Sequence, residues 1–133
     1  MFEAINKTSQ TVTAAGAIDL GTASVSDSIG RITLASASSI KIASAGKYKV
    51  SALFNVSNTT SSAVDDTIAL YSGSNELGLP ITVTVPATGN SEIVIEKIVN
   101  VLPASADTSA TIQFISSTGA TVTGCQVVIN KMI

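Results

Sequence analysis

Histidine and tryptophan are absent from this chain of 133 residues, and cysteine occurs once, at Cys125. Histidine is the usual general base beside serine or cysteine nucleophiles and the commonest ligand of transition metals, so the side chain most used in catalysis is missing. One cysteine excludes an intrachain disulfide and any paired-cysteine metal or redox site. We therefore expect a protein that is not an enzyme and has no metal or cofactor, with Cys125 as a small buried residue.

Charge is scarce as well. Only 12% of the residues are charged, seven of them basic and nine acidic, and the net charge is -2. The basic residues are scattered without a cluster, so we expect no nucleic-acid partner. So few charges leave apolar patches on a monomer's surface, which indicates a protein partner. No apolar run approaches the roughly 20 residues that cross a bilayer, and no secretory signal is recognisable, so we expect no membrane partner and synthesis in the cytoplasm.

Carboxylates occur in two arrangements that could carry chemistry. Asp65 and Asp66 are adjacent, and with Glu76 they could supply oxygen ligands for Ca²⁺. Because the spacing of an EF-hand loop is missing, we interpret the pair as solvated acids in a loop before a strand. Glu92 and Glu96 would lie roughly 13 Å apart along a strand, beyond the separation that glycosidase carboxylates use, and are expected to be surface charges.

The dominant pattern along the chain has a period of two, as half-buried strands require. It is clearest between Gly46 and Ser57, where Leu53 is the one large apolar residue on the polar face and therefore a candidate contact with a neighbouring element or subunit. The apolar face of this segment carries Tyr48, Val50, Ala52, Phe54 and Val56.

Two further segments predict long strands. Residues 91–102 are apolar on both faces and rich in β-branched side chains, which is typical of a strand covered on both sides. Residues 122–133 repeat the alternation. From the apolar phases of these strands and of residues 110–115 we predict the core as Tyr48, Val50, Phe54, Ile95, Val99, Ile112, Phe114, Val127 and Ile129.

Shorter strands are expected at residues 2–6, 11–13, 17–20, 31–34, 39–42, 67–71 and 81–85. Clusters of Ser, Gly, Asn and Asp between them, such as residues 72–75, indicate turns. Many short strands at this spacing predict an all-β sandwich or barrel. Pro80, Pro86 and Pro103 fall at the edges of these segments, where a proline removes no hydrogen bond from a ladder.

Three motifs occur in a characteristic order. Residues 40–52 (IKIASAGKYKVSA) place Gly-x-Tyr at the opening of a long strand, residues 67–77 (TIALYSGSNEL) end in a polar turn, and residues 125–133 (CQVVINKMI) form a closing strand. Their order resembles the C1q and tumour-necrosis-factor jelly-roll superfamily, especially its bacterial and bacteriophage members. The resemblance implies a jelly-roll β-sandwich over roughly residues 38–133, and a homotrimer, because members are typically compact trimers packed by apolar strand faces.

Two functions from different classes fit these features. We expect a virion structural protein, a trimeric decoration protein on the capsid surface of a bacteriophage head, made in the host cytoplasm, with itself and the major capsid protein as partners. The alternative is a receptor-binding or glycan-binding knob of a phage fibre or bacterial surface appendage. For that alternative, the chain has no tryptophan to stack on sugars, and Tyr48 is expected in the core.

The chain divides into residues 1–37, which form either an N-terminal arm or the first strands, and residues 38–133, the jelly-roll domain. If the first part is an arm, its apolar residues would find cover against a capsid. The expected capsid contacts are Phe2, Ile5, Ile18 and Leu20. The expected trimer interface consists of Leu53, Val94, Ile98 and Leu102.

Overall fold

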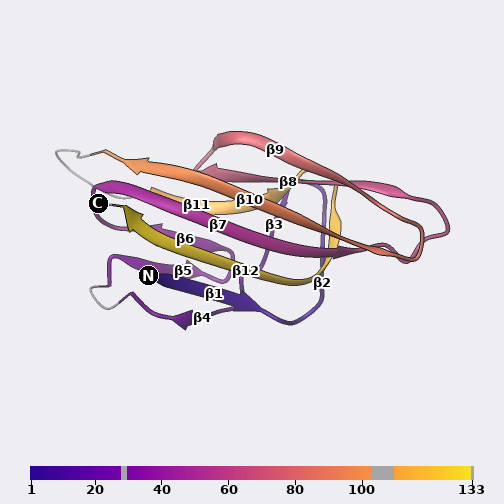
Figure 1. Ribbon diagram of the computed structural model, residues 1–133, viewed down its shortest axis with the longest axis horizontal. Helices are drawn as coiled ribbons and strands as arrows, with labels where there is room; N and C mark the ends of the chain where they lie inside the picture. Colours follow the sequence, from indigo (N-terminus) through magenta and orange to yellow (C-terminus); the bar gives the residue numbers. More distant parts are fainter. Residues whose placement is uncertain (28–29, 103–109, 133) are drawn as a thin grey trace.

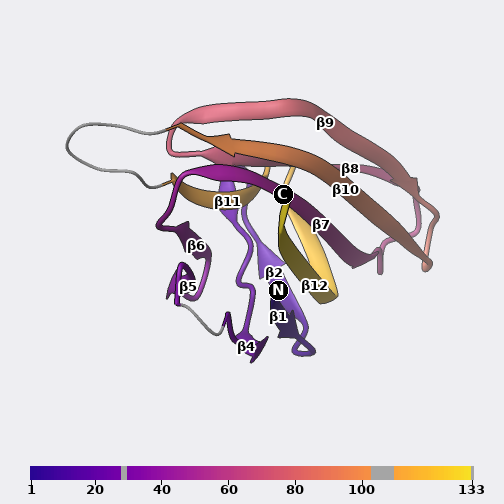
Figure 2. The same cartoon turned by 60° about the vertical axis from the view of Figure 1, so that its left-hand side comes forward.

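The computed structural model describes residues 1–27, 30–102 and 110–132, which form two antiparallel sheets packed face to face (Figure 1, Figure 2). Sheet A contains β1 (Phe2–Asn6), β2 (Gln10–Val12), β4 (Thr22–Val25), β7 (Gly46–Ser57), β10 (Asn90–Val101) and β12 (Ala120–Met132). Sheet B contains β3 (Gly16–Ala17), β5 (Ile32–Ser36), β6 (Ser39–Ile42), β8 (Val64–Ser72), β9 (Asn75–Val85) and β11 (Ala110–Ser116). The predicted all-β sandwich is confirmed.

The order of strands in sheet A is β10-β7-β12-β1-β4, with β2 paired to β12. In sheet B it is β5-β6-β11-β8-β9, with β3 paired to β11. Neighbours in each sheet are mostly distant in sequence, so nearly every ladder joins remote parts of the chain.

The core between the sheets follows the period of two. In β7 every second residue from Tyr48 to Val56 is buried, and the intervening residues face away from sheet B. Phe54 of sheet A and Phe114 of sheet B meet across the core, with ring centroids 5.1 Å apart in a tilted arrangement. All members of the predicted core are at most 6% exposed, so this prediction is confirmed.

The first residues of the chain lie inside the sandwich. β1 pairs with β12 on one side and with β4 on the other. Phe2 is 1% exposed, and Ile18 and Leu20 are fully buried. The prediction that these three residues contact a capsid is therefore wrong, because their strands and turns direct them into the core. Ile5 is half-buried and points away from the core, out of phase with its buried neighbours.

Gly21 allows β4 to begin close beside β1. Its φ is +77°, and a Cβ atom there would lie 2.2 Å from the carbonyl oxygen of Ile5. Only glycine accepts both the left-handed backbone and this close approach without a shift of the chain. The polar stretch that follows is strand β4.

Proline is placed differently from expectation at one position. Pro80 lies within β9, whereas the sequence predicted it at the edge of a strand. It lies in a bulge of β9 between Leu77 and Ile81, where the register with β8 shifts and no ladder hydrogen bond is needed from its nitrogen. The shift projects Leu79 into solvent, where it is 83% exposed. Pro103 lies outside the described residues.

The two ends of the chain lie at the same end of the sandwich (Figure 1). In the ladder between β1 and β12, Phe2 is paired with Ile129. The opposite end is formed where β7 stops and β8 and β12 begin, with Thr121 paired to Ser57. The sandwich therefore has one end with both termini and one end made only of turns.

Candidate functional site: the open face of sheet A

Sheet A has one face against the core and one that points away from sheet B, which we call the open face. Its middle is a row of side chains that crosses four strands, because Val94 is paired with Leu53, Leu53 with Gln126, and Gln126 with Ile5. Val128, paired with Ser51, lies beside this row. The strand ladder thus brings residues from distant parts of the chain onto one surface.

Large apolar side chains are exposed on this face. Val94 is 54% exposed and Ile98 is 50% exposed, while Leu102, just beyond the end of β10, is 67% exposed. The sequence predicted that residues 91–102 are covered on both sides, but among the described residues no element packs against this side of β10. The pattern therefore indicates a surface that the single chain leaves uncovered.

Polar side chains surround the apolar row and hold its edge in place. Glu3 accepts hydrogen bonds from Gln126 Nε2 at 2.8 Å and from Ser24 Oγ at 2.6 Å, which ties together β12, β1 and β4. Glu92, paired with Asn55, and Glu96, paired with Ser51, lie on either side of Val94 along β10. An apolar centre with a charged rim is the usual composition of a protein–protein interface.

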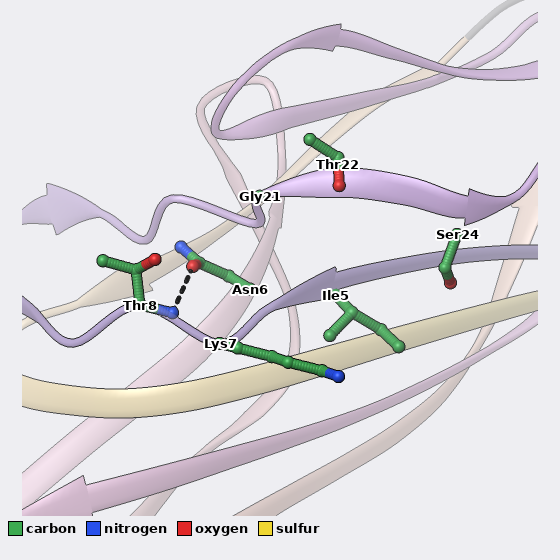
Figure 3. A pocket seen from close by; sticks show the side chains of 7 residues that line it. All are labelled: Ile5, Asn6, Lys7, Thr8, Gly21, Thr22 and Ser24. Carbon is green, nitrogen blue, oxygen red and sulfur yellow. Dashed lines mark hydrogen bonds between the residues drawn. The ribbon is translucent and has the colours of Figure 1, made fainter.

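The open face is only shallowly hollowed. A depression of about 240 Å³ lies over Leu53, Val94 and Val128. A second, of about 440 Å³, lies between β1 and β4, with Ile5 and Lys7 at its rim (Figure 3). Figure 3 also shows Asn6 Oδ1 accepting a hydrogen bond from the backbone N–H of Thr8, which closes the turn after β1. The residues that line the two depressions include no carboxylate.

The acidic residues considered as calcium ligands are not brought together. Asp65 and Asp66 are neighbours in β8, so their side chains point to opposite sides of sheet B. Asp65 accepts a hydrogen bond from Thr84 Oγ1 at 2.7 Å, whereas Asp66 is only 4% exposed. Glu76 is paired with Tyr71, at the other end of the ladder between β8 and β9. No cluster of three metal-ligating side chains exists among the described residues.

Asp66 is nevertheless not the solvated loop residue that the sequence suggested. It lies in β8 with its side chain among the buried residues. Burial raises the pKa of its carboxyl group above the usual 3.8, and the charge of Asp65 raises it further.

Cys125 behaves as a buried apolar residue. It is 6% exposed, and its Sγ lies 3.6 Å from the carbonyl oxygen of Asp19. Burial raises the pKa of the thiol to about 11, with a smaller opposing effect from a backbone hydrogen bond at Asn6. A thiol of this kind is a poor nucleophile near neutral pH.

Aromatic side chains do not form a sugar-binding platform. Tyr48 is fully buried, and its hydroxyl donates a hydrogen bond to the carbonyl oxygen of Ser44 at 3.0 Å. Tyr71 is half-buried, and the three phenylalanines are in the core.

The part of the chain that the structure describes contains no helix that is long and apolar enough to span a membrane.

No protein-family model and no curated protein sequence matches the chain. Solved structures do match. PRD1 vertex protein P5 has a TM-score of 0.59 and 20% identity, over 99% of this chain and 72% of that chain. Eiger TNF from S. frugiperda has a TM-score of 0.68 and 12% identity, over 99% of this chain and 93% of that chain. The chain has a tumour-necrosis-factor-like jelly-roll fold. Rabbit GITRL is also similar, with a TM-score of 0.50 and 12% identity over 77% of each chain.

Within this jelly roll, three of the four residues predicted for the trimer interface share the open face of sheet A. Leu53 and Val94 are direct cross-strand neighbours, and Ile98 follows four residues along β10. Leu102 lies past the end of that strand. The fold thus gathers Leu53, Val94 and Ile98 on one surface, while the interface itself stays a prediction.

The sequence reasoning missed three residues of the same face. Val128 is in the exposed phase of β12, where an apolar residue among polar ones was a signal like that of Leu53. Glu3 and Gln126 were not detectable, because their contact joins β1 to β12 and depends on the order of strands in the jelly roll.

Proposed function

We propose that this jelly roll is a structural protein of a bacteriophage particle that forms a homotrimer through the open face of sheet A and decorates the capsid. In this proposal it has no enzymatic activity. The observation that carries the proposal is the group of exposed apolar side chains on the open face of sheet A, on a chain with very few charges. Two of these side chains, Val94 and Ile98, are each about half exposed.

Self-association explains the exposed side chains energetically. Full burial of a valine, leucine or isoleucine side chain contributes about 1.5 to 3 kcal/mol relative to leaving it in water. A half-exposed side chain such as Val94 therefore stands to gain on the order of 1 kcal/mol in each protomer. A similar gain is expected at Ile98 and Leu102 in each of the three protomers. The summed gain offsets the loss of entropy on association.

The comparison with PRD1 vertex protein P5 supports the location on a particle. The name of that protein places it at the vertex of a virus particle, and the two chains share the fold over nearly the whole length of this one. The family resemblance supports the trimer. A capsid contact must use surface residues rather than Phe2, Ile18 or Leu20, because those three are buried in the core.

The trimer is tested by measuring particle mass. Multi-angle light scattering should return about 40 kDa, three times the 13.4 kDa chain. Val94→Glu places a charge in the middle of the open face and should shift the mass to that of one chain. Leu79→Glu is the matched control, since Leu79 is an exposed apolar residue on β9 of sheet B and its replacement should leave the trimer intact. A wild-type mass of 13.4 kDa at micromolar concentration would refute the trimer.

The capsid is tested separately. Purified protein should co-sediment with phage capsids stripped of their decoration proteins and should show no saturable binding on a glycan array. The reverse result would favour the receptor-binding or glycan-binding knob and would refute decoration. Val94→Glu, as a monomer, should bind capsids more weakly than Leu79→Glu, because a trimer engages several capsid sites at once.

A further inference from the structure

An open depression of about 360 Å³, which we call the Asp66 cavity, lies at the end of the sandwich that is remote from both termini. It lies between the two sheets, where β2 and β7 end and β8 and β12 begin. Its walls are mainly the backbone and hydroxyl groups of serine and threonine residues, together with Asn58, Asp65 and Asp66. This end is separate from the open face of sheet A.

Asp66 is the one acidic side chain directed into this space. Its place in β8 puts it in the same phase as the core residues Ile68 and Leu70, so it points between the sheets, and it is 4% exposed. Asp65 also borders the cavity, but its carboxylate points to the other side of sheet B and is bonded to Thr84. None of the described residues donates a hydrogen bond to the carboxylate of Asp66, and its oxygen atoms are not fully enclosed, so they keep some contact with water.

The remaining polar groups of the cavity do not supply the missing partner. No lysine or arginine is among the residues that line it, and every polar side-chain atom in its wall is an oxygen except the amide nitrogen of Asn58. That nitrogen is already engaged, at 2.7 Å from the carbonyl oxygen of Ser62. Asn58 Oδ1 in turn accepts hydrogen bonds from the backbone N–H and the hydroxyl of Thr60, so the rim is fixed by its own contacts.

A largely buried carboxylate that accepts no hydrogen bond from the described residues is costly, because its charge has lost most of its water and gained no partner. The cavity can therefore stabilise a group that brings both positive charge and hydrogen-bond donors. Ca²⁺ is a poor match, since it takes six to eight oxygen ligands and usually several carboxylates, whereas only Asp66 points inward. An ammonium group needs three acceptors, which one carboxylate and neighbouring hydroxyl or carbonyl oxygens can provide.

We propose that the cavity is a binding site for an alkylammonium group, with Asp66 as its counter-ion and the surrounding oxygens as further acceptors. The group can come from a small free amine or from a lysine side chain of a partner protein, since both present the same –NH₃⁺ on an alkyl stem. The volume of about 360 Å³ suits such a stem, being within the range of small-ligand pockets and far larger than an ion requires.

The test is an NMR titration of the full-length protein with n-butylammonium chloride, with ionic strength held constant by sodium chloride. We expect saturable shifts of the backbone amides of Asp66 and Thr118, with a dissociation constant on the order of millimolar. Asp66→Asn keeps the shape of the side chain and should weaken binding by about tenfold or more, because a charge-assisted hydrogen bond is lost. Asp65→Asn is the matched control, which removes the same charge one residue away and should leave binding within about threefold.

Other outcomes would refute the site or show whether its ammonium group comes from a free amine or from a lysine side chain. Shifts that never saturate, or an equal loss in the two variants, would overturn the proposal. So would saturation by calcium chloride in place of the amine, because that would identify a metal site. A second probe, Nα-acetyl-lysine methylamide, separates the sources: binding as tight as that of butylammonium supports a partner's lysine, and binding of the free amine alone supports a small ligand.

Discussion

Replacing Phe54 with alanine is expected to lower the free energy of unfolding by about 3 to 5 kcal/mol, the range for emptying a buried aromatic site. Phe54 is fully buried in β7, which has neighbours on both sides in sheet A. Its ring also packs against Phe114 of sheet B at 5.1 Å between centroids, and such a pair contributes about 0.5 to 1.5 kcal/mol beyond buried area. The site lies at the centre of the sandwich, so neighbours cannot collapse far into the space, and we expect the upper half of the range.

The loss can be measured by urea denaturation followed by far-ultraviolet circular dichroism. Single domains have about 5 to 15 kcal/mol of stability, so the variant should unfold at a much lower urea concentration. In a thermal scan its unfolding temperature should be about 10 to 20 °C below that of the wild type. Protein concentration must be the same in every sample, because unfolding of a trimer depends on concentration.

Two comparisons make the result specific. Phe54→Leu keeps most of the apolar volume and should cost about 1.5 kcal/mol or less. Leu79→Ala removes a side chain that is 83% exposed and should change stability by less than about 0.5 kcal/mol. If Phe54→Ala and Leu79→Ala gave similar midpoints, the inward phase of β7 and the account of the core would be refuted.

Three further predictions concern single side chains. Gly21→Ala should destabilise the protein by more than Gly73→Ala, since both glycines have positive φ but only at Gly21 would the new Cβ meet backbone, at 2.2 Å; equal midpoints in urea would contradict this. Asp66→Asn should stabilise the protein at pH 7, in phosphate rather than amine buffer. Because folding raises the pKa of Asp66 above 3.8, the folded state binds the proton of this carboxyl group more tightly than the unfolded state does. The stability of the wild type therefore falls as the pH rises above 3.8, and that of the variant does not. A stability difference between the two proteins that stays constant from pH 3 to 7 would refute this prediction. Cys125, whose pKa is raised to about 11, should react with iodoacetamide at pH 8 only after unfolding, as followed by mass spectrometry, and labelling of the folded protein at the rate of a free peptide thiol would contradict its burial.

The long strands were predictable because their information is local. The alternation of residues 46–57 fixes which side chains point inward, and the structure buries Tyr48, Val50 and Phe54 as expected. The same rule, applied to β8, separates Asp65 from Asp66, because adjacent residues of a strand face opposite ways. The expectation of two solvated acids was wrong because it placed the pair in a loop, where the period of two does not apply.

The role of the first residues was not predictable from local pattern. Phe2 is buried because β1 is inserted between β12 and β4, and the first of these neighbours lies at the far end of the sequence. Strand β4 has no buried residue, so it carries no alternation that a sequence pattern could reveal. Of the open face, Leu53 and Val94 were identifiable as misplaced apolar residues, but the hydrogen bond from Gln126 to Glu3 depends on strand order alone.

The pairing of Phe2 with Ile129 places the beginning and the end of the chain side by side. Neighbouring strands are about 5 Å apart, so a short linker could join the two ends, and new ends could be opened in the turn between β8 and β9 without crossing a ladder. A peptide or enzyme fused to either end would leave from the same end of the sandwich, away from the Asp66 cavity. A fusion at either end of these 133 residues would therefore extend from one end of the sandwich and leave the other end unobstructed.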